Sequence, residues 1–323
     1  MRIALINSGI GLLATAAELH RLRPDADLVL AMDPDGMPWG PRTPGDIAQR
    51  SLACARATAA FGPDVLVFAC NTGTVHALPA LRAEFEPAIP VVGTVPAIKP
   101  AAAFSDSVAI WATVATTAST YQRRLIDDFA GSARVTPVPC PGLADAVDAG
   151  DEAATRAAVA GAAARTPADC GAVVLGCTEY ELAADLIGAA LPGMTLFRSA
   201  AAVAAQALRR VATGGTDTGS EAAPSRTGTV RVLLSGRQAG LPEAALRYAE
   251  GRLLADLVVD DRPVDGRPVD GRPVDERPVG DRPVDDVRAD DRPVDDVRAD
   301  DRAAEPPAER EAERSVPPSS VPA

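Results

Sequence analysis

Two cysteines occupy matching positions in the chain, 107 residues apart. Cys70 ends the apolar stretch PDVLVFAC, and Cys177 ends the stretch DCGAVVLGC. A threonine follows each of them, Thr72 two residues after the first and Thr178 directly after the second. In open α/β sheets, ligands bind at the carboxyl ends of the strands. If both stretches are strands, we expect the two thiols to face one binding cleft.

Two opposed thiols suit a particular kind of chemistry. A cysteine between a strand and a helix lies near free amide N–H groups, which favour its thiolate form. One thiolate and one thiol can remove a proton from one face of a carbon and return a proton to the other. Asn71 adds a hydrogen-bonding side chain for a carboxylate or an ammonium group. The alternative for each cysteine alone is packing, because free cysteine is among the most buried residue types.

The elements that must position these thiols follow from the pattern of apolar residues. Continuous apolar runs are typical of parallel strands covered on both faces, and their alternation with helical patterns predicts an α/β fold. The predicted strands are residues 3–7, 28–32, 65–70, 91–94, 108–113, 135–138, 173–177 and 230–234. The predicted helices are residues 12–22, 44–61, 75–85, 120–129, 152–164, 181–190, 200–211 and 242–254.

The repeated cysteine setting predicts two similar domains with the active site in the cleft between them. The first α/β domain comprises residues 1–96, joined by 200–257, and the second comprises 97–199. Residues 213–229 are rich in Gly, Ser and Thr and predict a flexible loop. Residues 258–323 form a pentapeptide repeat with frequent proline and charge, which predicts a disordered tail.

Charge and cysteine content exclude several classes of protein. The 323 residues include Lys+Arg 32 and Asp+Glu 44, and the segment 258–323 holds 19 of the acidic and 11 of the basic residues. A basic nucleic-acid footprint is absent, and no apolar run reaches the roughly 20 residues of a membrane span. We therefore expect neither nucleic acid nor membrane as a partner. Five cysteines without C-x-x-C spacing and only two histidines predict no disulfide framework, no metal site and a reducing, cytoplasmic environment.

Short motifs carry a resemblance to a known family over almost the whole body of the chain. Their ordered set resembles the aspartate/glutamate racemase family, and within it the glutamate racemases. The motifs are NSG at 7–9, PWGPR at 38–42, ACNT at 69–72, VVGT at 91–94, ATVAT at 112–116, CPGL at 140–143 and GCTEY at 176–180.

The resemblance implies a cofactor-independent isomerase with two pseudosymmetric α/β domains. Its substrate would be a small acidic amino acid, with L-glutamate converted to D-glutamate for peptidoglycan, and a homodimer is common in the family. The resemblance assigns Cys70 and Cys177 as the two catalytic acid/bases. The positions that match the family's substrate pocket are Ser8, Trp39, Gly40, Asn71, Thr72, Thr113, Thr116 and Thr178.

Three auxiliary positions depart from the pattern of the glutamate racemases. The first motif usually reads DSG, and here Asn7 replaces the Asp; the residue after C-T is usually His, and here it is Glu179. The acidic residue after CPGL is usually Glu, and here the matching position is Asp148. An anion at position 179 would raise the pKa of Cys177 and favour its thiol form. A Glu after C-T is also similar to the aspartate racemases.

Other functions stay open beside glutamate racemisation. One is an aspartate racemase, or another racemase of acidic amino acids. A decarboxylase, a maleate isomerase and hydantoin racemases share the scaffold; a decarboxylase needs one cysteine, and hydantoin racemases take bulky neutral rings. The third is a catalytically silent homologue that binds a ligand or regulates, because all three auxiliary positions have changed.

Overall fold

The structure is a computed structural model that describes residues 1–213 and 227–259. The predicted flexible loop at 213–229 and the predicted tail at 258–323 lie outside these ranges except at their ends. Those ends are held by the fold. The N–H and the hydroxyl of Thr229 both donate to Asp27 Oδ1 at 3.0 Å, and Val258 forms a β-bridge with Val230.

The first sheet has six strands in the order β10-β9-β2-β1-β3-β4. All neighbours are parallel except β10, which runs antiparallel to β9. The pairing of β9 with β2 brings the C-terminal part of the described chain into this sheet. The strands are β1 (Arg2–Asn7), β2 (Asp27–Met32), β3 (Val65–Phe68), β4 (Val91–Gly93), β9 (Val230–Leu234) and β10 (Arg237–Ala239).

The second sheet has four parallel strands in the order β6-β5-β7-β8. The prediction of an α/β fold with parallel sheets is therefore confirmed. Both sheets lie within one compact unit, so the domain boundaries at residues 96 and 199 stay predictions. The strands are β5 (Ser107–Ala112), β6 (Arg134–Pro139), β7 (Ala172–Leu175) and β8 (Thr195–Phe197).

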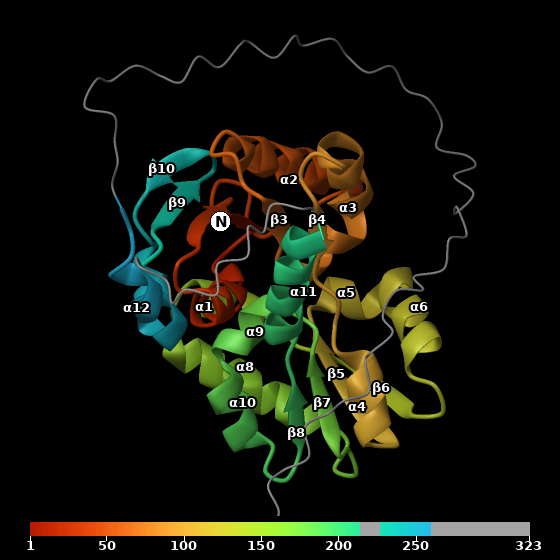
Figure 1. The fold of residues 1–323 in the computed structure, drawn as a ribbon. Coiled ribbons are helices and arrows are strands. Elements are labelled where there is room, and N and C mark those ends of the chain that lie inside the picture. Colours follow the sequence, from red (N-terminus) through yellow and green to blue (C-terminus); the bar gives the residue numbers. More distant parts are fainter. Residues whose placement is uncertain (214–226, 260–323) are drawn as a thin grey trace, which may run out of the picture. The chain divides into compact units, whose positions relative to one another are not determined.

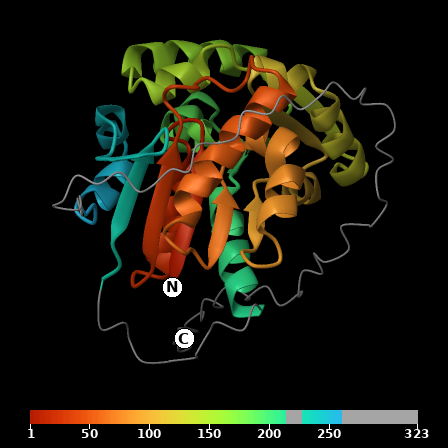
Figure 2. The ribbon, with the colours of Figure 1, turned by 90° about the horizontal axis from the view of Figure 1, so that it is seen from above.

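Helices cover both faces of each sheet (Figures 1 and 2). None of the helices in the described ranges is long and apolar enough to cross a membrane. Around the first sheet are α1 (Leu12–Leu22), α2 (Pro44–Ala59), α3 (Asn71–Phe85), α11 (Ala200–Thr213), the 3₁₀ helix η1 (Glu243–Arg247) and α12 (Ala249–Ala255). Around the second are α4 (Ile98–Phe104), α5 (Val114–Ala118), α6 (Thr120–Phe129), α7 (Leu143–Asp148), α8 (Glu152–Arg165), α9 (Thr178–Leu182) and α10 (Ala184–Ala190).

The two-residue period of the strands divides the core into layers. In β1, Ala4 and Ile6 join the apolar cluster formed with α2 and α3, whereas Ile3 and Leu5 join the cluster formed with α1, α11 and α12. In β5, Trp111 packs toward α8 and α10 on the opposite face of the sheet from α4 and α6. Because both faces are covered, β1 and β5 are apolar along nearly their whole length.

Several element boundaries differ from the predictions, and the differences matter for the thiols. Strand β3 ends at Phe68 and β7 at Leu175, so neither cysteine belongs to a strand. Helix α3 begins at Asn71 instead of residue 75, and α9 begins at Thr178 instead of 181. Each cysteine is thus the N-cap of its helix. An N-cap side chain lies directly beside the unpaired N–H groups of the first helical turn.

The sequence analysis missed several short elements, and two predicted helices are divided: the helix predicted at 181–190 is interrupted at Ala183, between α9 and α10. Strands β8 and β10 have three residues each, and α4, α5 and α7 have five to seven. Such lengths carry too few periods for a pattern to be read. The predicted helix 242–254 is interrupted at Tyr248, whose extended backbone separates η1 from α12.

Candidate active site

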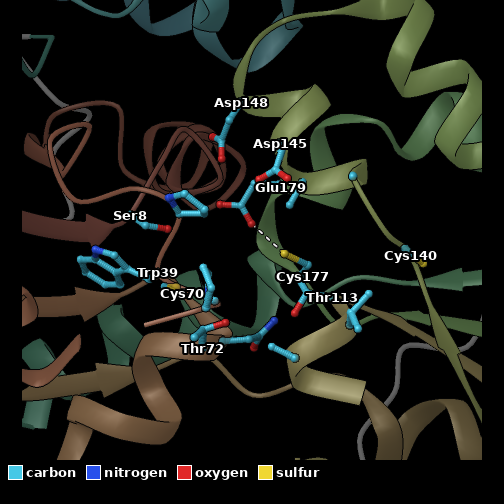
Figure 3. Close-up of a pocket in the computed structure, with 18 of the residues that line it drawn as sticks. Ser8, Trp39, Cys70, Thr72, Thr113, Cys140, Asp145, Asp148, Cys177 and Glu179 are labelled. Carbon is cyan, nitrogen blue, oxygen red and sulfur yellow. Dashed lines mark hydrogen bonds between the residues drawn. The ribbon is translucent and has the colours of Figure 1, made fainter. Parts of the chain in front are cut away.

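A cavity of about 440 Å³ opens at the carboxyl ends of β3 and β7 and holds both thiols (Figure 3). Ten predicted site residues line it: Ser8, Trp39, Gly40, Cys70, Asn71, Thr72, Thr113, Asp148, Cys177 and Glu179. The other three are not among the lining residues but form hydrogen bonds with residues that are. They are Asn7, Thr116 and Thr178.

On the first side of the cavity, the sulfur of Cys70 accepts a hydrogen bond. The donor is the backbone N–H of Gly73 in the first turn of α3, at 3.4 Å. Burial, and then the charge of Glu179, raise the pKa of Cys70 to about 12, while the N–H of Gly73 and the N–H and hydroxyl of Ser8 oppose this rise. The N–H and hydroxyl groups around this sulfur are donors that a thiolate would accept from, while burial and Glu179 favour the thiol.

On the second side, the sulfur of Cys177 donates a hydrogen bond. Its thiol points to Glu179 Oε2 at 2.8 Å (the dashed line in Figure 3). Burial raises the pKa of Cys177 well above its usual value, and the neighbouring Glu179 carboxylate raises it further. The charge of Cys70 contributes in the same direction, which places the two sulfurs within electrostatic reach of each other. The predicted effect of Glu179 on Cys177 thus has a geometric basis.

The two sides meet in a buried network behind the cavity. Asn7, at the end of β1, donates from Nδ2 to Glu179 Oε1 at 3.3 Å and to Thr178 Oγ1 at 3.1 Å. Its Oδ1 accepts from the Ser8 N–H at 2.7 Å. Since Asn7 comes from the first sheet and Glu179 from the helix after β7, the network joins both halves of the cleft.

Asp148, at the end of α7, is the second buried carboxyl of the site. Its Oδ1 accepts from the backbone N–H of Ile10 at 2.8 Å, which connects α7 to the loop after β1. Burial raises the pKa of Asp148 well above its usual value, and the charge of Glu179 adds to the shift. The surroundings of Asp148 therefore favour its protonated form.

Asn71 lines the cavity and has a buried acceptor without a protein partner. Its Nδ2 donates to Gly176 O at 2.8 Å across the cleft, which fixes the orientation of the amide. Its Oδ1 is buried and has no protein partner. A buried polar atom without a partner is unfavourable, so this oxygen suits a ligand N–H, such as that of an ammonium group.

The wall formed by Trp39 depends on a buried carboxylate that the sequence analysis did not single out. The indole Nε1 donates to Asp33 Oδ2 at 3.0 Å. The same oxygen accepts from Arg50, and Oδ1 accepts from Ser235 in the turn between β9 and β10. Asp33 thus ties the Trp39 side chain to α2 and to the C-terminal hairpin.

Further lining residues were missed or assigned differently by the sequence analysis. Cys140 and Asp145, to which the sequence analysis gave no role in the site, lie on the cavity wall. Both belong to the segment around the CPGL motif, which was the only available signal. Thr113 caps α5 by accepting from the Thr116 N–H, and its hydroxyl donates to Thr116 Oγ1 at 3.0 Å. Thr116 therefore supports Thr113 from outside the lining.

No lysine or arginine occurs among the described residues that line the cavity. A carboxylate in this cavity would be held by hydroxyl and backbone N–H groups, including those at the start of α3. The acidic side chains gather on the side of α7 and α9. Such an arrangement suits a ligand with both an ammonium group and carboxylates.

Comparisons with known proteins agree in pointing to one family. A family model described as Asp/Glu/Hydantoin racemase matches residues 6–207. The glutamate racemase of Pseudomonas putida strain W619 is 36% identical over 216 residues, which cover 65% of this chain and 81% of the relative. That of Herpetosiphon aurantiacus is 38% identical, with 65% and 84% covered.

A solved structure gives the same result at the level of the fold. Escherichia coli glutamate racemase, in complex with L-glutamate and the activator UDP-MurNAc-Ala, matches with a TM-score of 0.65. The identity is 28%, and the match covers 76% of this chain and 91% of the E. coli chain. From the matched residues and the shared fold, we conclude that the chain belongs to the Asp/Glu/hydantoin racemase family.

Proposed function

We propose that this chain is a glutamate racemase that interconverts L- and D-glutamate by proton transfer between two cysteines. One observation carries the proposal: Cys70 and Cys177 line one cavity, each as the N-cap of a helix that follows a parallel strand. Relatives that share more than a third of the aligned residues are named glutamate racemases.

The reaction proceeds with one sulfur as thiolate and the other as thiol. The thiolate takes the α-proton of glutamate, so that an S–H bond forms and the electron pair of the C–H bond stays on the α-carbon. The opposite thiol then gives its proton to the other face of that carbon and becomes a thiolate. The buried, hydrogen-bonded surroundings replace water around the developing charge.

The remaining lining residues bind and orient the substrate. Asn71 Oδ1 is a free acceptor for the α-ammonium group. Ser8, Thr72 and Thr113 supply hydroxyl donors for the two carboxylates, and Trp39 with Gly40 forms the facing wall. Thr116 and Thr178 position their neighbours, and Asn7, Asp148 and Glu179 act on the protonation of the thiols.

The product and the setting follow from the same proposal. D-glutamate supplies peptidoglycan synthesis and, with it, cell wall biogenesis. All five cysteines are free thiols, which suits a reducing cytoplasm. A homodimer stays a prediction.

The test is proton NMR of the purified protein in heavy water. With L-glutamate, we expect the α-proton signal to disappear while D-glutamate forms. Cys70→Ala and Cys177→Ala should each lower racemisation at least about a hundredfold, because each removes a proton-transfer group.

The result with L-aspartate separates the alternatives. Exchange of aspartate without exchange of glutamate would assign the chain to aspartate racemisation and leave the two-thiol chemistry intact. Binding of glutamate without exchange of either amino acid would identify a catalytically silent homologue.

A further inference from the structure

We propose that Glu179, held in place by Asn7, keeps Cys177 as the proton-bearing thiol of the resting enzyme, so that Cys70 is the base that begins the reaction. This inference rests on the proposed function, since it divides the acid and base roles between the two thiols named there. Glu179 is a positioning residue in this scheme: it acts on substrate only through Cys177.

The first support is the direction of the hydrogen bonds at the two sulfurs. Cys70 Sγ accepts from the Gly73 N–H, a bond that a thiolate strengthens. Cys177 Sγ lies 2.8 Å from Glu179 Oε2. A carboxylate only accepts hydrogen bonds, so this contact is made by the thiol form of Cys177 and lost by its thiolate. The two thiols therefore meet opposite partners, a donor at Cys70 and a carboxylate at Cys177, so that Cys70 is the one that gives up its proton more readily.

The second support is the rigidity of Glu179. Its side chain is 4% exposed, with Oε1 accepting from Asn7 and Oε2 from both Cys177 and Thr178. The amide of Asn7 cannot turn over without losing the bond from the Ser8 N–H to Oδ1. This bond holds the Nδ2 of Asn7 toward Glu179.

The neutral charge of Asn7 is part of the same arrangement. A carboxylate at this position would stand against the carboxylate of Glu179 in a buried site, where like charges repel strongly. An amide instead supplies the donor that Glu179 needs. The side chains at positions 7 and 179 thus act as one unit, with a single carboxylate placed on the Cys177 side of the cleft.

The cycle that follows from this arrangement is asymmetric. After turnover from the resting state, Cys70 holds a proton and the Cys177 thiolate stands beside the Glu179 carboxylate. Repulsion between these anions raises the free energy of this state, and Cys177 regains a proton from water while Cys70 releases one to water. L- and D-glutamate have equal free energies, so kcat/KM must be equal in both directions. The asymmetry appears as kcat and KM that differ between the two directions by a common factor.

The experiment is site-resolved alkylation of the free protein by iodoacetamide, with each cysteine followed by peptide mass mapping. Thiolates react and thiols do not, so the rates report the order of deprotonation. Cys140 lines the same cavity and donates its hydrogen bond to Val138 O, so it serves as an internal reference for entry of the reagent. In the parent protein, Cys70 should react at least about ten times faster than Cys177, as expected for a pKa difference of one unit or more.

Glu179→Gln is the decisive variant. Its amide can donate to Cys177, so the ratio of the Cys177 rate to the Cys70 rate should rise at least about tenfold. Glu179→Asp retracts the carboxylate by one methylene and should give a smaller rise. The matched control is Asp145→Asn, which removes another carboxylate of the same cavity and should leave the ratio unchanged. Circular dichroism checks that each variant is folded.

The outcomes separate this inference from the proposed function. An unchanged ratio in folded Glu179→Gln, or a parent in which Cys177 reacts first, would overturn the assignment of Glu179 while leaving a two-thiol racemase. Full racemisation by Cys70→Ala or Cys177→Ala would overturn the proposed function itself, whatever the order of alkylation. Both the inference and the proposed function would be supported if kcat and KM differ between the two reaction directions by the same factor, and if this factor shrinks in Glu179→Gln.

Discussion

The two thiol-bearing loops have nearly the same backbone and opposite chemistry at the sulfur. Each follows a fully buried four-residue strand, and each cysteine is an N-cap with extended backbone angles, φ −145° and ψ 120° at Cys70, φ −136° and ψ 137° at Cys177. Helix α3 offers the Gly73 N–H to its cysteine, whereas the short α9 offers the carboxylate of Glu179. The backbone places the sulfur, and the residues that follow decide whether it accepts or donates.

The largest effect is expected from Gly73→Ala on the Cys70 side. A Cβ at this position would overlap the ring of Phe68, which is fully buried. The first turn of α3 would have to move and withdraw its N–H from Cys70. We expect kcat/KM to fall about a hundredfold, or about 2.7 kcal/mol of transition-state stabilisation.

Racemisation kinetics and thermal melting measure this effect. Gly45→Ala, in the first turn of α2, is the control because a Cβ there meets no atom within 4 Å. If Gly73→Ala were as active as Gly45→Ala, the N–H of Gly73 would not be what distinguishes the Cys70 side.

The next effect concerns the Trp39 wall, which belongs to the side of the first sheet. In the parent protein, the Asp33 carboxylate accepts hydrogen bonds from Trp39, Arg50 and Ser235. Asp33→Asn leaves one oxygen acceptor for these three donors. The indole should lose its fixed position, so KM for glutamate should rise about tenfold while kcat changes less than about threefold.

Steady-state kinetics and indole fluorescence follow this change. Ser235→Ala removes one of the three bonds to Asp33 and leaves the indole bond in place. It should change KM less than about threefold. A fall in kcat without a rise in KM in Asp33→Asn would contradict a purely positional role for this residue.

A moderate effect on stability is expected from Asp148→Asn, at the boundary between the two sides. Burial raises the pKa of Asp148 in the folded state, so the stability it contributes is complete below its unfolded pKa of about 3.8 and is lost as the pH rises through the folded pKa. Asn does not titrate and can accept the same bond from Ile10.

Melting temperatures between pH 5 and pH 8 test this sign. As the pH rises, the melting temperature of the variant should increase relative to that of the parent, by a few degrees at pH 8. A change of about 1 kcal/mol in unfolding free energy shifts the melting temperature by roughly 2–4 °C for a protein of this size. Parallel profiles for the two proteins would show that Asp148 is ionised in the folded state throughout this range.

The smallest effects are expected from exposed ion pairs, one on each side. Arg56 pairs with Glu84 between α2 and α3, and Arg134 pairs with Asp169 beside the second sheet. Glu84→Gln and Asp169→Asn should each lower the melting temperature by less than about 3 °C and leave kcat unchanged, since water screens such pairs. A large fall in melting temperature in only one of the two variants would show that the two sides of the molecule differ in stability.

Much of the candidate site could be predicted because it lies at the ends of local patterns. Ser8, Cys70 and Cys177 lie within two residues of the ends of apolar strands, and in parallel sheets such positions converge at one edge. The sequence analysis missed Asp33 and Gly73, because the role of each depends on a contact that only the folded chain makes. The role of Asp33 depends on Ser235, 202 residues away, and that of Gly73 depends on the space taken by the Phe68 ring. Neither dependence leaves a periodic signal in the chain.

The sequence by itself determined the alternation of strands and helices and the place of each cysteine between them, because these depend on hydrophobic periodicity and on neighbours a few residues away. The tertiary structure alone decided what each sulfur meets. Asn7 and Glu179 are 172 residues apart, and their bond exists only where the first sheet and the helix after β7 come together. A hydrogen bond requires atoms within about 3.5 Å at a suitable angle, and only packing brings distant segments to that distance.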